Sequence, residues 1–370
     1  MARYIALSEE TYAAFRTPTT TYLYFKLLSE SITLTREDYF PETAEHWTVV
    51  DKGEGHFSHA GDFEVLIEPN QWPKLLVMFI GDSSATNVTG TAYSNIWKFG
   101  EDENFSAVTK MKPFTTYIGV DGVLSGGVDD DRQICGTVIE TLTIEGTARE
   151  VLSSTVSVLG SGLENLTTAL TQEDVTTGLE AAYDQPYFVF GDMVEARIGG
   201  TVIAGGVTED TGTNVLASAT GTSIESLSLT LKRSYDTEYY MLGQRYWHKP
   251  ILSGMAEVTG TMELSWQDQL EYERYLGSAA ATADQSSFAL QFRWQGAGDA
   301  DTGAPVVPYE LEIIIPSVYY TGSSIPVSAR DRIKQTVDFK GIYNTTLNCA
   351  AWIEVVNKNN GYATLVNVAV

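Results

Sequence analysis

Four side chains that could hold a metal ion lie close together in the segment GEGHFSHAGD: Glu54, His56, His59 and Asp62. Imidazole and carboxylate groups are common zinc ligands. The glycines around the two histidines disfavour the helix that would set both imidazoles on one face, and no second group of ligands lies nearby in the sequence. We therefore expect ordinary loop histidines here rather than a metal site.

Two further clusters could attract cations. Glu42, Glu45 and His46 form one, and the turn GGVDDDRQ carries Asp129–Asp131. Adjacent carboxylates point in different directions and rarely chelate one ion together. We interpret both clusters as solvated loops.

Motifs for nucleophilic or nucleotide chemistry are missing. The sequence has no GxSxG elbow, no phosphate loop ending in Gly-Lys-Ser/Thr, and no GxGxxG that opens a helix after a strand. A pair of carboxylates on either side of a sugar cleft stays possible, and the sequence does not locate one. We predict no catalytic residue, no cofactor and no enzymatic activity.

The chain is strongly acidic. Its 370 residues include 23 Lys and Arg against 48 Asp and Glu, which gives a formal net charge of −25. This balance disfavours tight binding to phosphate backbones or anionic lipid. It suits a surface past which DNA slides, because each basic contact to a phosphate would hold the DNA back. Solubility alone is the other explanation for the acidity.

The sequence also bears on where the protein is made. Cys135 and Cys349 lie far apart without CxxC spacing, so we predict two free thiols. The start, MARYIALSEETY, reaches two glutamates before an apolar core of signal-peptide length can form. No apolar run of about 18 residues occurs. We expect a chain that is cytosolic when made and has no membrane span.

Short segments that alternate apolar and polar residues dominate the chain, and period two predicts β-strands. Breaks containing Gly, Asp and Asn separate the segments and suit hairpin turns. The predicted strands are 32–35, 63–67, 114–120, 136–144, 151–159, 224–231, 288–294 and 309–315.

Two segments have helical spacing instead. Residues 70–80 (NQWPKLLVMFI) and 266–276 (WQDQLEYERYL) place apolar side chains three to four residues apart, and each runs into a glycine. Pro73 suits the first turn of a helix. The sequence therefore predicts a mainly β protein with two helices.

The order of these elements repeats along the chain. Each helix follows a strand, precedes further strands, and lies downstream of a similar segment, SESITLTRE from Ser29 or SIESLSLTLKR from Ser223. We infer an internal duplication. The predicted parts are an N-terminal arm (1–19), a first domain (20–175), a connector (176–214) and a second domain (215–370).

The opening SEETYAAFRTP, the Ser-Glu-Ser strand at Ser29 and the element order resemble the tail tube family of long-tailed bacterial and archaeal viruses. The resemblance covers nearly the whole chain and consists of spacing and pattern. It implies two tail-tube-like β-sandwich or β-barrel domains, each with one flanking α-helix. Members with two such domains look like they form homotrimeric, pseudo-hexameric rings that stack into a tube.

The resemblance further implies a virion tail protein whose partners are copies of itself, a tape measure protein, and the tail terminator and distal tail proteins. DNA would transit the lumen without specific binding. We assign the channel lining to polar residues of strands that could join subunits, and ring or subunit contacts to aromatic loop residues. The proposed lining residues are Glu140, Thr141, Thr143, Glu145, Glu310 and Glu312. The proposed contact residues are Tyr39, Phe40, Trp47, Phe57, Tyr235, Tyr239, Tyr240, Tyr246 and Trp247.

Three alternatives stay open at this point. The aromatic loop residues could cap the core of their own domain rather than contact a neighbour. The protein could be another β-rich virion component, such as a baseplate hub or capsid decoration protein. It could also be a carbohydrate-binding or carbohydrate-active β-sandwich, whose aromatic residues would line a groove.

Overall fold

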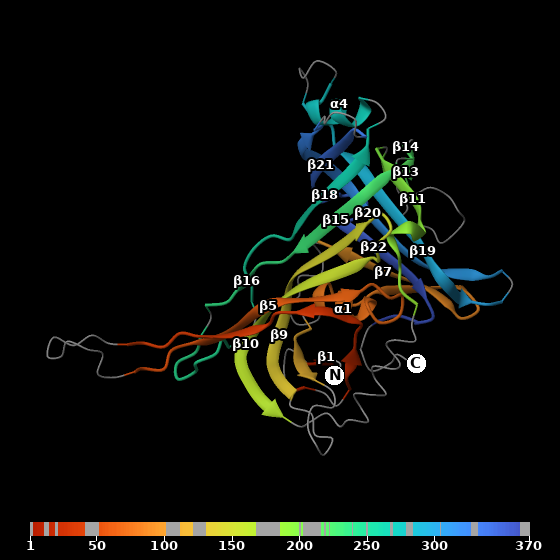
Figure 1. Ribbon diagram of the computed structural model, residues 1–370. Helices are drawn as coiled ribbons and strands as arrows, with labels where there is room; N and C mark the ends of the chain where they lie inside the picture. The colour runs from red at the N-terminus through yellow and green to blue at the C-terminus, as the bar shows by residue number, and fades with distance from the viewer. Residues whose placement is uncertain are drawn as a thin grey trace.

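The chain folds into a mainly β structure with two α-helices in its described part (Figure 1). The computed structural model describes residues 3–10, 15–18, 21–40, 52–100, 112–120, 131–167, 186–199, 201–202, 216–217, 220–221, 223–238, 240–248, 251–266, 269–278, 284–303, 305–326 and 332–362. Every predicted strand lies within or overlaps an observed strand, so the predicted fold class is confirmed.

One group of strands, which we name the first strand set, comes from the N-terminal part of the chain. Its antiparallel pairings run β3 and β4 to β5, then β10, β9, β8 and β1. The strands are β1 (Arg3–Glu9), β3 (Leu27–Glu30), β4 (Thr33–Arg36), β5 (Phe57–Leu66), β8 (Phe114–Val120), β9 (Asp131–Thr147) and β10 (Ser153–Thr167).

The second strand set repeats this order of pairing. It runs from β15 to β18, then β21, β20, β19 and β11. Its strands are β11 (Met193–Ile198), β15 (Ile224–Lys232), β18 (Glu257–Ser265), β19 (Phe288–Asp301), β20 (Val307–Ser324) and β21 (Lys334–Gly341).

Some of the irregularities in the ladders fall at the same places in both sets. Three β-bulges of the first set, where the register shifts, each have a counterpart in the second. The bulge at residues 27–29 matches the one at 224–226, and the bulge at 114–116 matches the one at 288–290. The third lies next to the pair Thr141–Ser157 in the first set and next to the pair Gly322–Asp338 in the second. Counted through the ladders, residues 29–36 (SESITLTR) occupy the position of residues 226–233 (SLSLTLKR).

Each set carries one helix, as the sequence predicts. Helix α1 (Pro73–Phe79) begins with its proline, and α4 (Leu270–Leu276) ends at Gly277, whose φ of 81° is the left-handed conformation of a helix C-terminus. All residues of α1 are buried, whereas α4 has no buried residue and lies at the upper end of the molecule in Figure 1.

A further antiparallel layer extends the sheet beside β20. The last strand pairs with β20 and with the second strand of a hairpin that follows α1. These three strands are β22 (Ala351–Asn357), β6 (Ser84–Thr89) and β7 (Ala92–Phe99). The buried amides of Asn95, Asn357 and Asn359 and the hydroxyl of Tyr362 hydrogen-bond one another beneath this layer.

Smaller elements complete the described chain. They are β2 (Leu23–Tyr24), β12 (Thr201–Val202), β13 (Leu216–Ala217), β14 (Thr220–Gly221), β16 (Tyr235–Asp236), β17 (Ile251–Leu252) and the 3-10 helix η2 (Phe190–Asp192).

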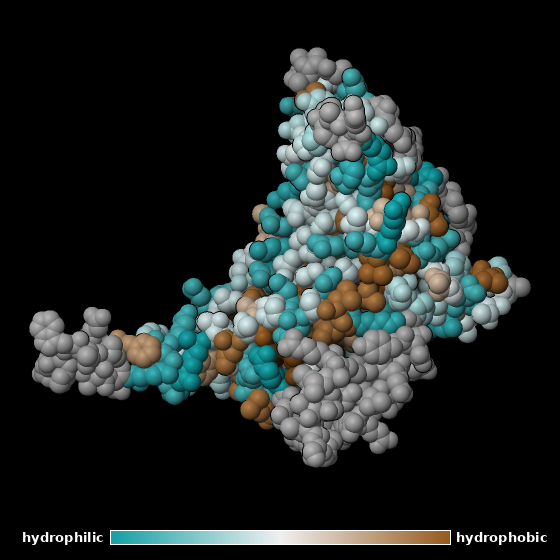
Figure 2. Space-filling model, viewed as in Figure 1, coloured by the Kyte–Doolittle hydropathy of each residue, from teal (hydrophilic) through white to brown (hydrophobic). Residues whose placement is uncertain are grey.

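Two hairpins leave the body on the same side. The hairpin of β4 and β5 projects to the left in Figure 1, and the segment that contains β16 and β17 runs beside it. Figure 2 shows hydrophilic residues along the described base of the longer hairpin, while hydrophobic residues gather in a band across the middle of the visible face.

Candidate functional site

The two strand sets are joined by a direct strand pairing, which we name the internal seam. Residues 141–147 of β9 pair antiparallel with residues 226–232 of β15. At its two ends the Arg233 N–H donates to the Glu140 carbonyl and the Ala148 N–H to the Glu225 carbonyl, each at 2.8 Å. The seam makes one continuous sheet with the strand order β20, β21, β18, β15, β9, β10, β5, and then β3 with β4.

One face of the internal seam belongs to the hydrophobic core. Leu142 and Ile144 of β9 and Leu227, Leu229 and Leu231 of β15 are each no more than 2% exposed. Burying an aliphatic side chain of this size contributes about 1.5–3 kcal/mol. The seam is therefore held by side-chain packing as well as by its hydrogen-bond ladder.

The opposite face of the seam is polar, because strand side chains alternate between faces. The hydroxyls of Thr143 and Thr230 lie 3.2 Å apart, and the Ser228 hydroxyl donates to Glu145 at 3.1 Å. An ion pair between Lys232 and Glu140, at 3.5 Å, also crosses the seam. Hydroxyl and acidic groups thus dominate this face of the seam, and its lysine, Lys232, is paired with Glu140.

The structure places four of the six predicted lining residues at this seam: Glu140, Thr141, Thr143 and Glu145. The other two, Glu310 and Glu312, lie on a different stretch of β20, between β19 and β22. Glu310 forms an ion pair with Arg293 at 2.8 Å, and Glu312 accepts a hydrogen bond from Gln291. The six residues therefore do not form one surface.

The β15 side of the polar face was missed by the sequence analysis. Ser226, Ser228, Thr230 and Lys232 alternate with the buried leucines of β15. Polar residues and leucines alternate in the segment SLSLTLK. The period-two pattern that predicted the strand could therefore also have identified its polar face.

Comparison with known proteins tests the resemblance. A family model described as phage tail tube protein matches residues 3–341. The chain belongs to the phage tail tube protein family. The matched segment begins with β1 and ends at the last residue of β21, so it takes in both strand sets. No curated protein matches the chain.

Family membership decides between the classes that the sequence left open. The chain is a structural phage tail tube protein and a tail component of the virion. Phage tail tube proteins assemble with copies of themselves, so the surfaces of interest are those that can join copies of the chain. Within its described part, no helix has the length and apolar character needed to span a membrane.

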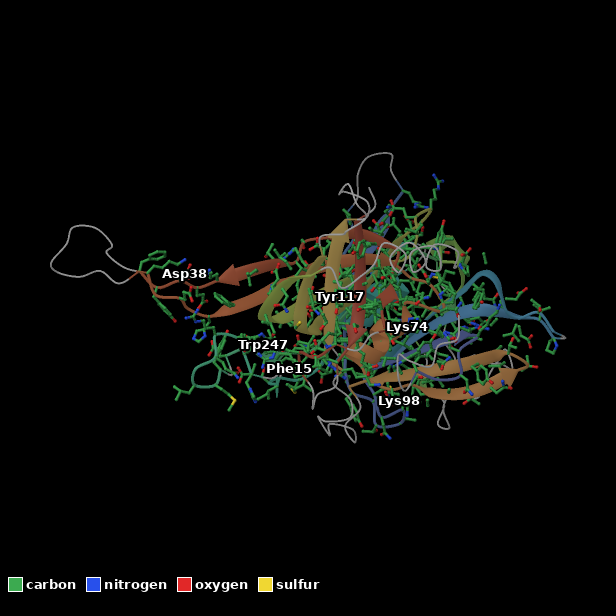
Figure 3. All side chains as sticks on the ribbon, turned by 90° about the horizontal axis from the view of Figure 1, so that it is seen from below. Phe15, Asp38, Lys74, Lys98, Tyr117 and Trp247 are labelled. Atoms are coloured by element: carbon green, nitrogen blue, oxygen red, sulfur yellow. The ribbon has the colours of Figure 1, made fainter. Side chains whose placement is uncertain are left out.

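The predicted aromatic contact residues of the tube protein differ in exposure. Tyr39 and Phe40 are each 57% exposed and directly follow Asp38, which Figure 3 labels on the projecting hairpin. Trp247 is 1% exposed, and the ring of Tyr246 lies against the Arg16 guanidinium. Phe57, Tyr235 and Tyr240 are half-buried, while Trp47 and Tyr239 lie outside the described residues.

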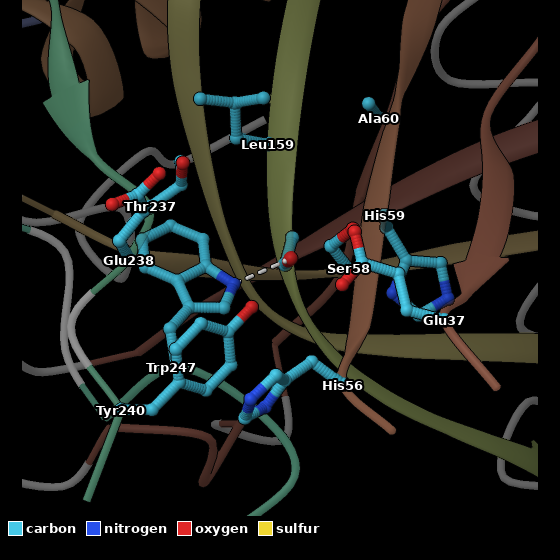
Figure 4. Close-up of a pocket in the computed structure, with 11 residues that line it drawn as sticks. Glu37, His56, Ser58, His59, Ala60, Leu159, Thr237, Glu238, Tyr240 and Trp247 are labelled. Atoms are coloured by element: carbon cyan, nitrogen blue, oxygen red, sulfur yellow. Dashed lines mark hydrogen bonds between the residues drawn. The ribbon is translucent and has the colours of Figure 1, made fainter. Parts of the chain in front are cut away.

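Trp247 anchors the second strand set to the first. Its indole N–H donates to the Gly160 carbonyl of β10 at 2.7 Å, and its ring closes one side of a pocket of about 460 Å³ (Figure 4). Beside it the rings of His56 and Tyr240 pack with centroids 4.0 Å apart. Trp247 is therefore buried inside its own subunit, where it joins the two predicted domains rather than capping the core of its own domain as the alternative interpretation expects.

His59, predicted as an ordinary loop residue, is a buried strand residue of β5. Its Nε2 lies 2.8 Å from Glu164, which also pairs with Arg132 at 2.8 Å. Burial lowers the pKa of His59. Glu54 instead pairs with Arg36 on the hairpin. In the described ranges no group of three or more His, Cys, Asp or Glu is arranged to hold a metal ion.

The other sequence candidates divide in the same way. Cys135 and Cys349 are free and buried, which confirms the prediction of two free thiols. The acidic cluster at Glu42, Glu45 and His46 lies outside the described residues. Of Asp129–Asp131, only the last is described, as the first residue of β9.

Glu312 makes the stability of the tube protein depend on pH. Burial and the nearby Glu354 raise its pKa from 4.5 to about 7, so the folded subunit prefers the protonated acid. Stability from this group is present below pH 4.5 and is lost as pH rises toward 7. Glu312→Gln should therefore stabilise the unassembled subunit by about 1–3 kcal/mol at pH 8 and by much less at pH 4.5. Urea unfolding at both pH values measures this, and an equal effect at the two would contradict it.

Proposed function

We propose that three copies of the tube protein close into a ring, and that the rings stack into the tube through which viral DNA passes to the host. One observation carries this proposal: a single sheet of eight strand positions runs through both strand sets, with β3–β4 at one end and β20 at the other. A sheet with two open edges gains hydrogen bonds when copies pair edge to edge. Head-to-tail contacts of this kind form a ring when the rotation closes.

We further propose that the two strand sets are copies of one module, as the sequence analysis inferred. The shared order of pairing and the coincident bulges support this. Each module then begins with its own leading strand, β1 or β11, and spans about 3–167 or 193–341 rather than starting at 20 or 215. A ring of three chains would have pseudo-sixfold symmetry.

The polar face of the sheet is the surface we assign to the channel. Thr141, Thr143 and Glu145 lie on it, and we leave Glu310 and Glu312 out because the layer with β22 pairs against their stretch of β20. Three sheets of eight strand positions would make a closed sheet of 24. With strands about 4.8 Å apart and tilted by about 40°, its backbone diameter is about 45–50 Å. Acidic and hydroxyl groups on that wall would hold water, and its lysines, Lys232, Lys334 and Lys340, are paired with glutamates, so the wall would not grip DNA.

Electron microscopy of the purified protein tests this function. We expect trimers at low concentration and tubes of uniform width at high concentration, with threefold averages that have six similar lobes. A subunit that stays monomeric at every salt and protein concentration would contradict the proposal. The tape measure, terminator and distal tail partners, and assembly in the host cytoplasm, stay predictions from the resemblance.

A further inference from the structure

The internal seam is a template for a second pairing that the isolated subunit leaves incomplete. Along one edge of β9, residues 132–137 pair with β8 and residues 141–147 pair with β15. The corresponding edge of β20 pairs with β19 as far as Val318. Beyond that point, in the part of the chain that is described, residues 319–324 pair only with β21 on the opposite edge.

The other strand of the internal seam, β15, also has an equivalent with an open edge. β15 pairs with β18 on one edge and β9 on the other. Its equivalents β3 and β4 pair, within the described ranges, with β5 alone. Leu231 of β15 is fully buried, whereas Leu34, at the same position of β4, is 43% exposed. An exposed leucine in place of a core leucine marks a surface that a neighbour covers.

We propose that the open edge of β3 and β4 in one copy pairs antiparallel with the open edge of β20 in the next. Transfer of the internal register places Leu34 opposite Ser323, because Leu231 lies opposite Leu142 in the internal seam. Thr33 then faces Ser324, as Thr230 faces Thr143. We name this pairing the ring seam. It deepens the proposed ring, on which it rests, by naming the surfaces and the register that close it.

Backbone polarity agrees with this register. Ser31 donates its N–H to the Asp62 carbonyl of β5, and Glu37 donates to the His56 carbonyl just ahead of β5. Because N–H groups alternate between the two edges of a strand, the N–H of Leu34 faces the open edge. In the isolated subunit the Glu30 carboxylate accepts the Ile32 N–H at 2.7 Å, which covers another donor of that edge. Side-chain cover of this kind limits wrong pairing of an exposed strand.

Pro326, the second residue after β20, fits this register as well. The proposed register puts Pro326 opposite Ser31, two residues beyond the facing pair of Thr33 and Ser324. Such pairs alternate with hydrogen-bonded ones, and this position needs no N–H toward the neighbour. A proline, which has none, is tolerated there.

A pair of engineered cysteines tests the ring seam. Thr33→Cys combined with Ser324→Cys places two thiols at a facing, non-hydrogen-bonded pair, where Cα atoms lie about 4.5 Å apart and a disulfide can form. The native Cys135 and Cys349 are buried and should contribute little background. After mild oxidation of assembled protein, we expect most chains in covalent dimers and trimers on a non-reducing gel, with no larger species and full reversal by reductant.

Matched variants make the result specific. Thr143→Cys with Thr230→Cys should give the equivalent bond inside one chain. Thr33→Cys with Ser323→Cys, which is one residue out of register, should give at least tenfold less product.

Dimers from Thr33→Cys alone would mean that like edges pair, which would overturn the ring seam. Rings in the microscope without covalent trimers would also overturn it and leave the proposed function standing. Absence of rings from the wild type would overturn both.

Discussion

Leu34→Pro is expected to abolish ring and tube formation while the isolated subunit stays folded. Proline removes the N–H that Leu34 directs to the open edge, and its pyrrolidine group occupies space where the next copy would lie. An unsatisfied Ser323 carbonyl in each seam costs about 1–3 kcal/mol, and a closed ring contains three such seams. Sedimentation velocity and electron microscopy should therefore find monomers at concentrations where the wild type forms tubes.

The fold of the Leu34→Pro subunit should change little, because proline is tolerated on an edge strand when its nitrogen faces away from the sheet. We expect its free energy of unfolding to stay within about 1 kcal/mol of the wild-type monomer. Leu34→Ala, which keeps the N–H, is the matched control and should weaken assembly without abolishing it. Normal tubes from the proline variant would rule out pairing through this edge.

Trp247→Ala is expected to lower the free energy of unfolding of the subunit by about 3–5 kcal/mol. The substitution empties a site that is 1% exposed and removes the hydrogen bond to the Gly160 carbonyl. Because the indole joins a loop of the second strand set to β10 of the first, the loss should loosen the two sets from each other. Urea unfolding of the unassembled subunit measures the effect.

Trp247→Phe separates the two contributions of the indole. It keeps a six-membered aromatic ring in the site and loses the N–H donor with the five-membered ring that carries it, so we expect a smaller cost of about 1–3 kcal/mol. If Trp247 acted between rings instead, both variants would leave monomer stability unchanged and impair only stacking. That pattern would contradict the anchoring role.

Sequence patterns predicted the elements whose two faces differ. Residues 226–231 of the predicted strand 224–231 alternate strictly, and β15 (Ile224–Lys232) matches that prediction almost residue for residue. The helices, predicted at 70–80 and 266–276, are α1 (Pro73–Phe79) and α4 (Leu270–Leu276). Both predicted starts are early; at α1 proline fits only the first turn, so Asn70 to Trp72 form turns ahead of it.

Strands buried on both faces were not predicted. All seven residues of β22 are buried, so the segment AWIEVVN has no period of two. β1 (RYIALSE) likewise pairs with β8 although its sequence was assigned to an arm. A pattern also says which face of a strand is polar but not which strand lies beside it. The pairing of β9 with β15 depends on contacts about 85 residues apart, which explains why the sequence left the seam unspecified.

The covalent link between the two strand sets has a consequence for how many units a ring can hold. β9 and β15 meet within one molecule, so every second junction of the proposed annulus exists before any encounter between molecules. Only three junctions remain to be made. Two of them join separate molecules and cost translational freedom, and the third closes the ring within the assembled trimer. Because each chain brings two strand sets, a closed ring always contains an even number of sets. A ring of five or seven sets in place of six therefore cannot form.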